Sequence, residues 1–216
     1  MRFPALILAA LLAVGAQPAR PETAARYTMI FDATWSAATH PQDFPWRAHF
    51  TGPIGATHDS NYRLFGPGGT ATEGLRRVAE SGKDSPLDQE IGQAIKDGSA
   101  GALIVGDTLF QLPGQTSVEF AIDERHPLVS LVTMIAPSPD WFAGVADVSL
   151  RNGGQWVAEK SISVYAWDAG TDSGTTYRAA DAVTQPRGKV ALSDAPYFRK
   201  DGQPLPVGTF TFKRVM

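Results

Sequence analysis

The sequence predicts a mainly β protein, an antiparallel β-sandwich with one or two short helices. Three observations lead to this fold class: many short segments alternate apolar and polar residues, most are bounded by Gly, Pro, Asp or Asn, and only one region has helical spacing. The 216 residues contain no Pro/Ser/Gly-rich linker that would divide them. One domain with one sizeable core is therefore expected.

The clearest strand is residues 27–35, in which every second residue is apolar, from Tyr27 through Phe31 to Trp35. Similar patterns with turn-forming neighbours predict further strands. These lie at residues 47–51, 102–105, 117–122, 128–135, 145–150, 156–165, 189–192 and 209–215.

Two segments between the early strands have helical spacing. Residues 72–81 place their apolar residues on one face. A second helix is expected after Ser85, with Ser85 as N-cap and Pro86 at the first helical position, ending near Gly98.

The first residues have the pattern of a secretory signal peptide. A basic start is followed by the short apolar run 5–14 and the small residues Gly15 and Ala16. We expect a signal peptide at about 1–19 and the folded domain at 26–216. The apolar run is too short to span a bilayer comfortably, so the chain is expected to be exported, either periplasmic or secreted, and not membrane-spanning.

Charge and cysteine content exclude several functions. The formal net charge is −3 and the basic residues are scattered, so nucleic acid is not an expected partner. The chain has no cysteine, which excludes thiol catalysis and cysteine-ligated zinc. Exported animal domains of this size commonly carry disulfides, so an exported chain without cysteine is more typical of a bacterial protein.

Residues 167–174, Trp-Asp-Ala-Gly-Thr-Asp-Ser-Gly, carry two carboxylates four positions apart, Asp168 and Asp172. Gly170 and Gly174 allow a tight loop in which acids and carbonyls face one point, an arrangement that suits a calcium ion. The spacing differs from that of an EF-hand. From this loop alone, a metal site and an ordinary Asp/Gly turn are both open.

A second acidic position, Asp140, lies in the run Ser138-Pro139-Asp140-Trp141 after a strongly apolar strand. The prolines end the strand and place Asp140 in a loop beside aromatic residues, where it either caps a turn or serves as a ligand. Taken alone, the turn is the simpler interpretation.

No set of residues indicates a catalytic centre. His49 and His58 lack the spacing of a metal pair, and structural hydrogen bonding is expected for them. Ser130, His126 and Asp123 offer the residue types of a triad but no nucleophile motif. We therefore expect no catalytic residues.

Together these segments resemble the spondin N-terminal domain family, the module of F-spondin and mindin. The resemblance covers about residues 27–192. It is carried by Trp35-Ser36 with Thr39-His40-Pro41, His49-Phe50, Ile54-Gly55-Ala56-Thr57-His58, Ala79-Glu80 with Gly82, 126–130, 134–141 with Gly144, and 167–174.

The resemblance implies a sandwich similar to a C2 domain with a divalent cation, taken as Ca²⁺, held at one end by Asp140, Asp168 and Asp172. It further implies adhesion or recognition at the cell surface or envelope, with a protein, polysaccharide or glycolipid as ligand. A metal-dependent hydrolase and a purely structural envelope or matrix protein are the alternatives. For Trp141 and Trp167, a ligand platform and core packing both remain open.

Overall fold

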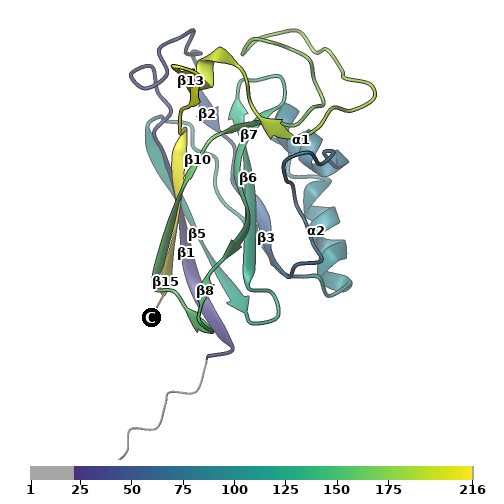
Figure 1. Ribbon diagram of the computed structural model, residues 1–216, viewed down its shortest axis with the longest axis vertical. Coiled ribbons are helices and arrows are strands. Elements are labelled where there is room, and N and C mark those ends of the chain that lie inside the picture. Colours follow the sequence, from purple (N-terminus) through teal and green to yellow (C-terminus); the bar gives the residue numbers. More distant parts are fainter. Residues whose placement is uncertain (1–21, 216) are drawn as a thin grey trace, which may run out of the picture.

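The computed structural model describes residues 22–215, in which two β-sheets face each other and two helices cover one of them (Figure 1). The predicted signal peptide at 1–19 lies outside the described residues. The predicted antiparallel β-sandwich is confirmed. Among the residues that the structure describes, no helix combines the length and apolar character needed to cross a membrane.

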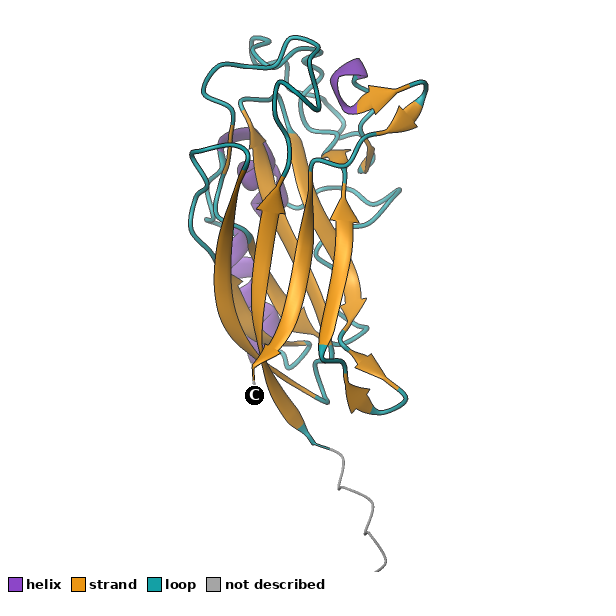
Figure 2. Cartoon of the chain, turned by 90° about the vertical axis from the view of Figure 1, so that its left-hand side faces the viewer, coloured by secondary structure: helices purple, strands orange, loops and turns teal. Residues whose placement is uncertain are grey.

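The first sheet has four antiparallel strands and faces the viewer in Figure 2. Its strands, in spatial order, are β10 (Glu159–Val164), β15 (Gly208–Val215), β1 (Ala24–Ala33) and β5 (Gly114–Asp123). Strand β1 keeps the predicted alternation: Tyr27, Met29 and Phe31 are buried, and the residues between them are partly exposed. This period of two directs one side of the sheet into the core.

The second sheet lies behind the first and has a long central hairpin, β6 (Leu128–Ala136) and β7 (Trp141–Ser149). Its main path is β12 (Ala191–Leu192), β11 (Ala166–Asp168), β7, β6, β3 (Ile54–His58) and β4 (Ala100–Val105), with β2 (His49–Phe50) also paired to β6. Three smaller elements are the hairpins β8 (Arg151–Asn152) with β9 (Gln155–Trp156) and β13 (Arg199–Lys200) with β14 (Gln203–Pro204), and the 3₁₀ turn η1 (Pro196–Phe198).

Helices α1 (Glu73–Ser81) and α2 (Leu87–Lys96) pack on the outer face of the second sheet (Figure 1). Helix α1 begins after Thr72, whose hydroxyl accepts the Leu75 N–H at 3.1 Å, and it ends at Gly82 in the left-handed conformation. The predicted Ser85 cap of α2 was wrong. Its hydroxyl accepts from the Gln89 side chain, and α2 starts two residues later with no side-chain cap.

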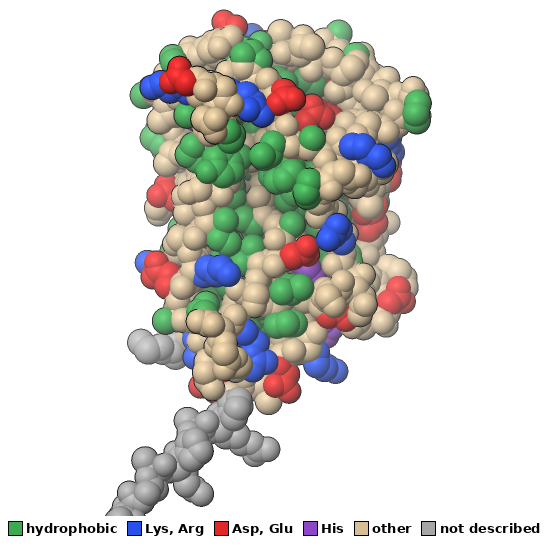
Figure 3. All heavy atoms as spheres, in the orientation of Figure 1, with side chains coloured by type: hydrophobic (Ala, Val, Ile, Leu, Met, Phe, Trp, Pro, Cys, Tyr) green, Lys and Arg blue, Asp and Glu red, His purple; other side chains and the backbone are tan. Residues whose placement is uncertain are grey.

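The core has two parts, because the second sheet is buried on both faces. Aromatic residues such as Phe31, Phe210 and Trp141 fill the space between the sheets. A second cluster, including Val132 and Leu75, lies between the second sheet and the helices. On the face shown in Figure 3, hydrophobic side chains gather over the middle, and acidic and basic side chains are interspersed around them.

Three strand predictions needed correction. Residues 47–51 form only the two-residue strand β2, because Arg47 adopts a left-handed φ of 64° that a strand does not accommodate. Residues 156–165 do not form one strand. The backbone N–H of Val157 donates to Leu150 and its carbonyl accepts the Tyr27 hydroxyl, so the chain leaves β9 before β10 begins. The predicted strand at 189–192 is reduced to β12, because the Val190 N–H donates to the carbonyl of Gly69 instead of to a strand.

Candidate metal centre

The pairing of β7 with β11 brings two of the three predicted acids together. In the register of this pair, Asp168 lies opposite Trp141, the residue after Asp140. The turn before β7 is closed by Ser138, whose hydroxyl accepts the Trp141 N–H at 3.0 Å. Asp140, which directly precedes β7, and Asp168, the last residue of β11, are therefore brought together at one end of this strand pair.

Asp140 lies in the turn before β7, as predicted, and it is fully buried. Its Oδ2 accepts the backbone N–H groups of Thr171 at 2.7 Å and Asp172 at 3.1 Å, and the Thr171 hydroxyl at 3.3 Å. Its Oδ1 is buried and has no hydrogen-bond partner among the described residues. Such an oxygen is costly unless a proton or a cation satisfies it.

The electrostatics of Asp140 follow from this burial. Its pKa is raised from 3.8 to about 6, first by burial and then by the negative charge of Asp168, although the bonds from Thr171 and Asp172 oppose the change. Near neutral pH the folded protein therefore holds a buried carboxylate that its surroundings disfavour. A cation beside Oδ1 would offset that charge.

Asp168 is partly buried at the end of β11, and its Oδ1 accepts the Gly170 N–H at 2.7 Å. Its pKa is also raised, mainly by burial and to a smaller degree by the charges of Asp194 and Asp172. Asp168 and Asp194 line one cavity of about 300 Å³, together with Trp141 and Ser193. Asp168 is therefore reachable from this cavity.

Asp172 has a different role, because both of its oxygens are used by the loop that follows. Oδ1 accepts the Gly174 N–H at 2.7 Å and Oδ2 accepts the Ala182 N–H at 2.8 Å. Asp172 also forms an isolated β-bridge with Val183. The carboxylate therefore fixes the loop 172–183, and the Asp172 backbone joins this loop to Asp140.

The residues present suit an oxygen-liganded cation only in part. Asp140 has one unused oxygen and Asp168 faces a cavity, which matches the preference of calcium for carboxylates, carbonyls and water. Within residues 22–215, no three or more His, Asp or Glu side chains are grouped as a ready-made metal site. The three-carboxylate site of Asp140, Asp168 and Asp172 therefore stays a prediction, with Asp140 and Asp168 as its best-placed members.

Two contributors to this region had no signal in the sequence. Thr171 donates two hydrogen bonds to Asp140 from 31 positions away. Asp194 reaches the Asp168 cavity from the segment after β12. Only the paired strands and the folded loop bring these residues together.

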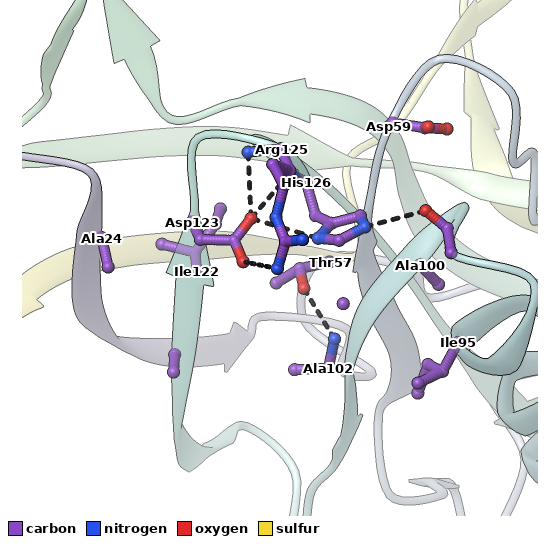
Figure 4. Close-up of a pocket in the computed structure, with 13 residues that line it drawn as sticks. Ala24, Thr57, Asp59, Ile95, Ala100, Ala102, Ile122, Asp123, Arg125 and His126 are labelled. Atoms are coloured by element: carbon purple, nitrogen blue, oxygen red, sulfur yellow. Dashed lines mark hydrogen bonds and ion pairs between the residues drawn. The ribbon is translucent and has the colours of Figure 1, made fainter.

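A larger cavity of about 690 Å³ lies at the opposite end of the sandwich, between β4 and β5 (Figure 4). Figure 4 shows His126 beside Asp123: Nδ1 lies 3.1 Å from Asp123 Oδ1, and Nε2 lies 3.1 Å from the Gly98 carbonyl. Asp123 Oδ1 also accepts the backbone N–H groups of Arg125 and His126. These contacts close a turn, which is a structural role.

Ser130 is buried elsewhere and contacts a different histidine. Its Oγ lies 2.7 Å from His58 Nε2 and accepts the Asp147 N–H at 3.0 Å, while His58 Nδ1 lies 2.7 Å from the Asp59 carbonyl. Both ring nitrogens of His58 are therefore used, as expected for structural hydrogen bonding. Ser130, His126 and Asp123 do not form a triad.

The two tryptophans next to the predicted ligands pack against other aromatic side chains. Trp141 is buried in the core between the sheets. Trp167 is partly buried, and its ring lies edge-on to Phe65 at 5.5 Å between centroids. Core packing is therefore the role that these contacts describe.

Comparison with known proteins gives the family of the chain. The Spondin_N family model matches residues 25–204. Spondin-1 of Gallus gallus is 38% identical over 177 residues, covering 77% of this chain and 21% of that protein. Spondin-2 of Homo sapiens is 36% identical over 198 residues, covering 86% and 59%. Spondin-1 of Xenopus laevis is 31% identical over 208 residues, covering 88% and 25%.

The chain belongs to the spondin N-terminal domain family, as the extent of the family match and these identities show. It is thus a spondin-type β-sandwich module. The chain spans about a fifth of the length of the Gallus gallus relative and about three fifths of the Homo sapiens relative.

Proposed function

We propose that this chain is an exported calcium-binding module that recognises a ligand at the cell surface or envelope. Asp140 and Asp168 supply the main carboxylate ligands, and Asp172 completes the acidic set while fixing the neighbouring loop. When bound, the ion neutralises the carboxylates and joins the two loops that carry them. Recognition then takes place through the loops at this end of the sandwich.

One observation carries the proposal: the Asp140 carboxylate is fully buried, and one of its oxygens has no partner among the described residues. Native proteins pair nearly all such atoms, and an unpaired one indicates an ion, a proton or water. The nearby negative charge of Asp168 favours a cation at this oxygen over a neutral partner. The oxygen-only side chains favour a hard cation such as calcium.

Binding is supported better than hydrolysis by the positions of the candidate catalytic groups. His58 and His126 each use both ring nitrogens in structural contacts. Ser130 is fully buried, and its hydroxyl is held by His58 and Asp147. A general base needs a free acceptor atom, and the ring nitrogens of both histidines are engaged in structural contacts.

Calcium binding is tested by melting curves in chelator and in saturating calcium. At about 100 times its dissociation constant, one ion stabilises the fold by about 2.7 kcal/mol. For a domain of this size that corresponds to a rise in melting temperature of roughly 5 to 10 °C. Asp168→Ala is expected to abolish the rise.

The matched control is Asp181→Asn, because Asp181 is an exposed acid in the loop after Asp172. This variant removes the same charge and should keep the full calcium response. Wild-type melting curves that coincide in calcium and in chelator would refute the ion site. Equal loss of response in both variants would assign the effect to general charge instead.

A further inference from the structure

A second feature is an exposed tryptophan with two arginines close to its ring. Trp46, in the segment between β1 and β2, is 64% exposed. The guanidinium carbon of Arg47 lies 4.3 Å from the centroid of its ring and that of Arg178 lies 5.7 Å away. Arg178 also donates to the Trp46 carbonyl at 3.4 Å. The exposed indole presents an apolar ring face and a polar N–H at the surface.

Within residues 22–215, the two arginines have no carboxylate partner. In the part of the chain that the structure describes, neither Arg47 nor Arg178 forms an ion pair, although twelve such pairs occur elsewhere. Their guanidinium groups are exposed on a chain of net charge −3. Arginine forms paired hydrogen bonds with carboxylates, so this pair offers a local site for an anionic group.

A cavity of about 380 Å³ adjoins the tryptophan and is lined by Asp43, Trp46, Arg178 and the aromatic residue Tyr197. The Tyr197 ring packs on Tyr177 with centroids 4.6 Å apart, and both are largely buried, so this wall is rigid. The cavity thus combines aromatic surfaces, one cation, Arg178, and a hydrogen-bond acceptor, Asp43. Arg47 does not line the cavity but lies over the Trp46 ring at its edge. This volume is in the usual range for a small-molecule site.

The backbone of the tryptophan segment is strained at both sides. Asp43 has a φ of 49° and Arg47 a φ of 64°, in the left-handed region that non-glycine residues rarely adopt. Between them, Phe44 packs edge-on against the buried Trp35 at 5.1 Å and holds the segment in place. Strain of this kind, held by surrounding packing, concentrates at ligand-binding sites.

We propose that Trp46, Arg47 and Arg178 bind an acidic saccharide, a glycan containing hexuronate units. The arginines would bind the carboxylate, the aromatic surfaces would contact the C–H face of the sugar ring, and Asp43 would accept a sugar hydroxyl. The acidic Asp43 in the cavity disfavours a densely charged phosphate polymer and favours a ligand with spaced carboxylates and many hydroxyls.

This inference rests on the proposed recognition function, because it names the class of ligand. The two sites are physically connected. The loop that carries Arg178 is held by Asp172 through the Gly174 and Ala182 N–H groups. A cation bound near Asp172 would therefore fix the position of Arg178.

The test measures binding of the full chain to oligosaccharides by calorimetry, in calcium and in chelator. The probes are trisaccharides of galacturonate and of guluronate and a hyaluronan tetrasaccharide, with maltotriose as the neutral comparison. At least one acidic probe should bind at least tenfold more tightly than maltotriose. Arg178→Gln and Trp46→Ala should each weaken that binding by tenfold or more.

Arg125→Gln is the matched control, since Arg125 is an exposed arginine at the opposite end and its loss changes the net charge equally. It should leave the affinity unchanged. Failure of every acidic probe, or equal losses in Arg178→Gln and Arg125→Gln, would overturn the saccharide site. Melting curves in calcium test the ion site separately, because Arg178→Gln should keep the full calcium response, whereas Asp168→Ala should lose it.

Discussion

Replacing Asp140 with asparagine should have opposite effects in chelator and in calcium. Asparagine keeps an oxygen for the N–H groups of Thr171 and Asp172, and it removes the negative charge from a fully buried site. In chelator the variant should lose the penalty of that buried charge. In calcium it should also lose the ligand that the ion needs.

The magnitude follows from the pKa of Asp140. A rise from 3.8 to about 6 corresponds to roughly 3 kcal/mol, at about 1.4 kcal/mol for each tenfold change in proton affinity. Because the folded state holds the proton more tightly than the unfolded chain, this contribution favours folding below pH 3.8. It is lost as pH rises from about 4 to about 6, so metal-free wild type should lose stability across that window.

The assay is urea unfolding at a series of pH values from 4 to 8, in chelator and in saturating calcium. In chelator, the decrease in unfolding free energy between pH 4 and pH 7 should be smaller in Asp140→Asn than in wild type, by roughly 2 to 2.5 kcal/mol, since part of the full difference is already lost at pH 4. In calcium at pH 7, wild type should gain stability and the variant should not. Identical pH profiles for the two proteins in chelator would refute the reasoning about Asp140.

Three further substitutions test the packing and hydrogen bonding of the fold. Gly74→Ala in α1 would place a Cβ 2.6 Å from the Cα of Leu87, and the clash between the helices should cost about 1–3 kcal/mol in urea unfolding. Gly92→Ala in α2 has no atom within 4 Å of the new Cβ and should stabilise by about 1 kcal/mol, so a loss there would contradict the packing described. Ser130→Ala should lower the unfolding free energy by about 1–3 kcal/mol, because the Asp147 N–H loses its acceptor. An unchanged melting temperature would contradict a structural role for Ser130.

The sequence predicted strands well where one face is buried and the other is exposed to solvent. Strand β1 is the clearest case, because every second residue enters the core. Strand β3, residues 54–58, gave no alternation, because all five residues are buried between β4 and β6. Its Gly55, which indicates a turn in the sequence, is a point of close approach: a Cβ there would lie 1.9 Å from the Ser130 carbonyl oxygen.

The acidic residues of the candidate site were predictable from the sequence, but their burial and hydrogen-bond partners were not. Asp168 and Asp172 were visible as a loop pattern, and Gly170 does adopt a positive φ of 71° there. Sequence offered no reason to bury Asp140, since its burial arises when the loop from β11 folds over it and donates the Thr171 and Asp172 N–H groups. Such contacts depend on strand register, which a local pattern does not contain.

The central claim, that this spondin-type module holds a calcium ion at Asp140 and Asp168, is tested most directly by metal analysis of natively purified protein followed by calorimetric titration of the stripped protein with calcium. The predicted result is one calcium per chain in wild type, with the site restored on titration and absent in Asp168→Ala. A wild-type protein that contains no divalent metal and gives no heat of calcium binding would contradict the claim.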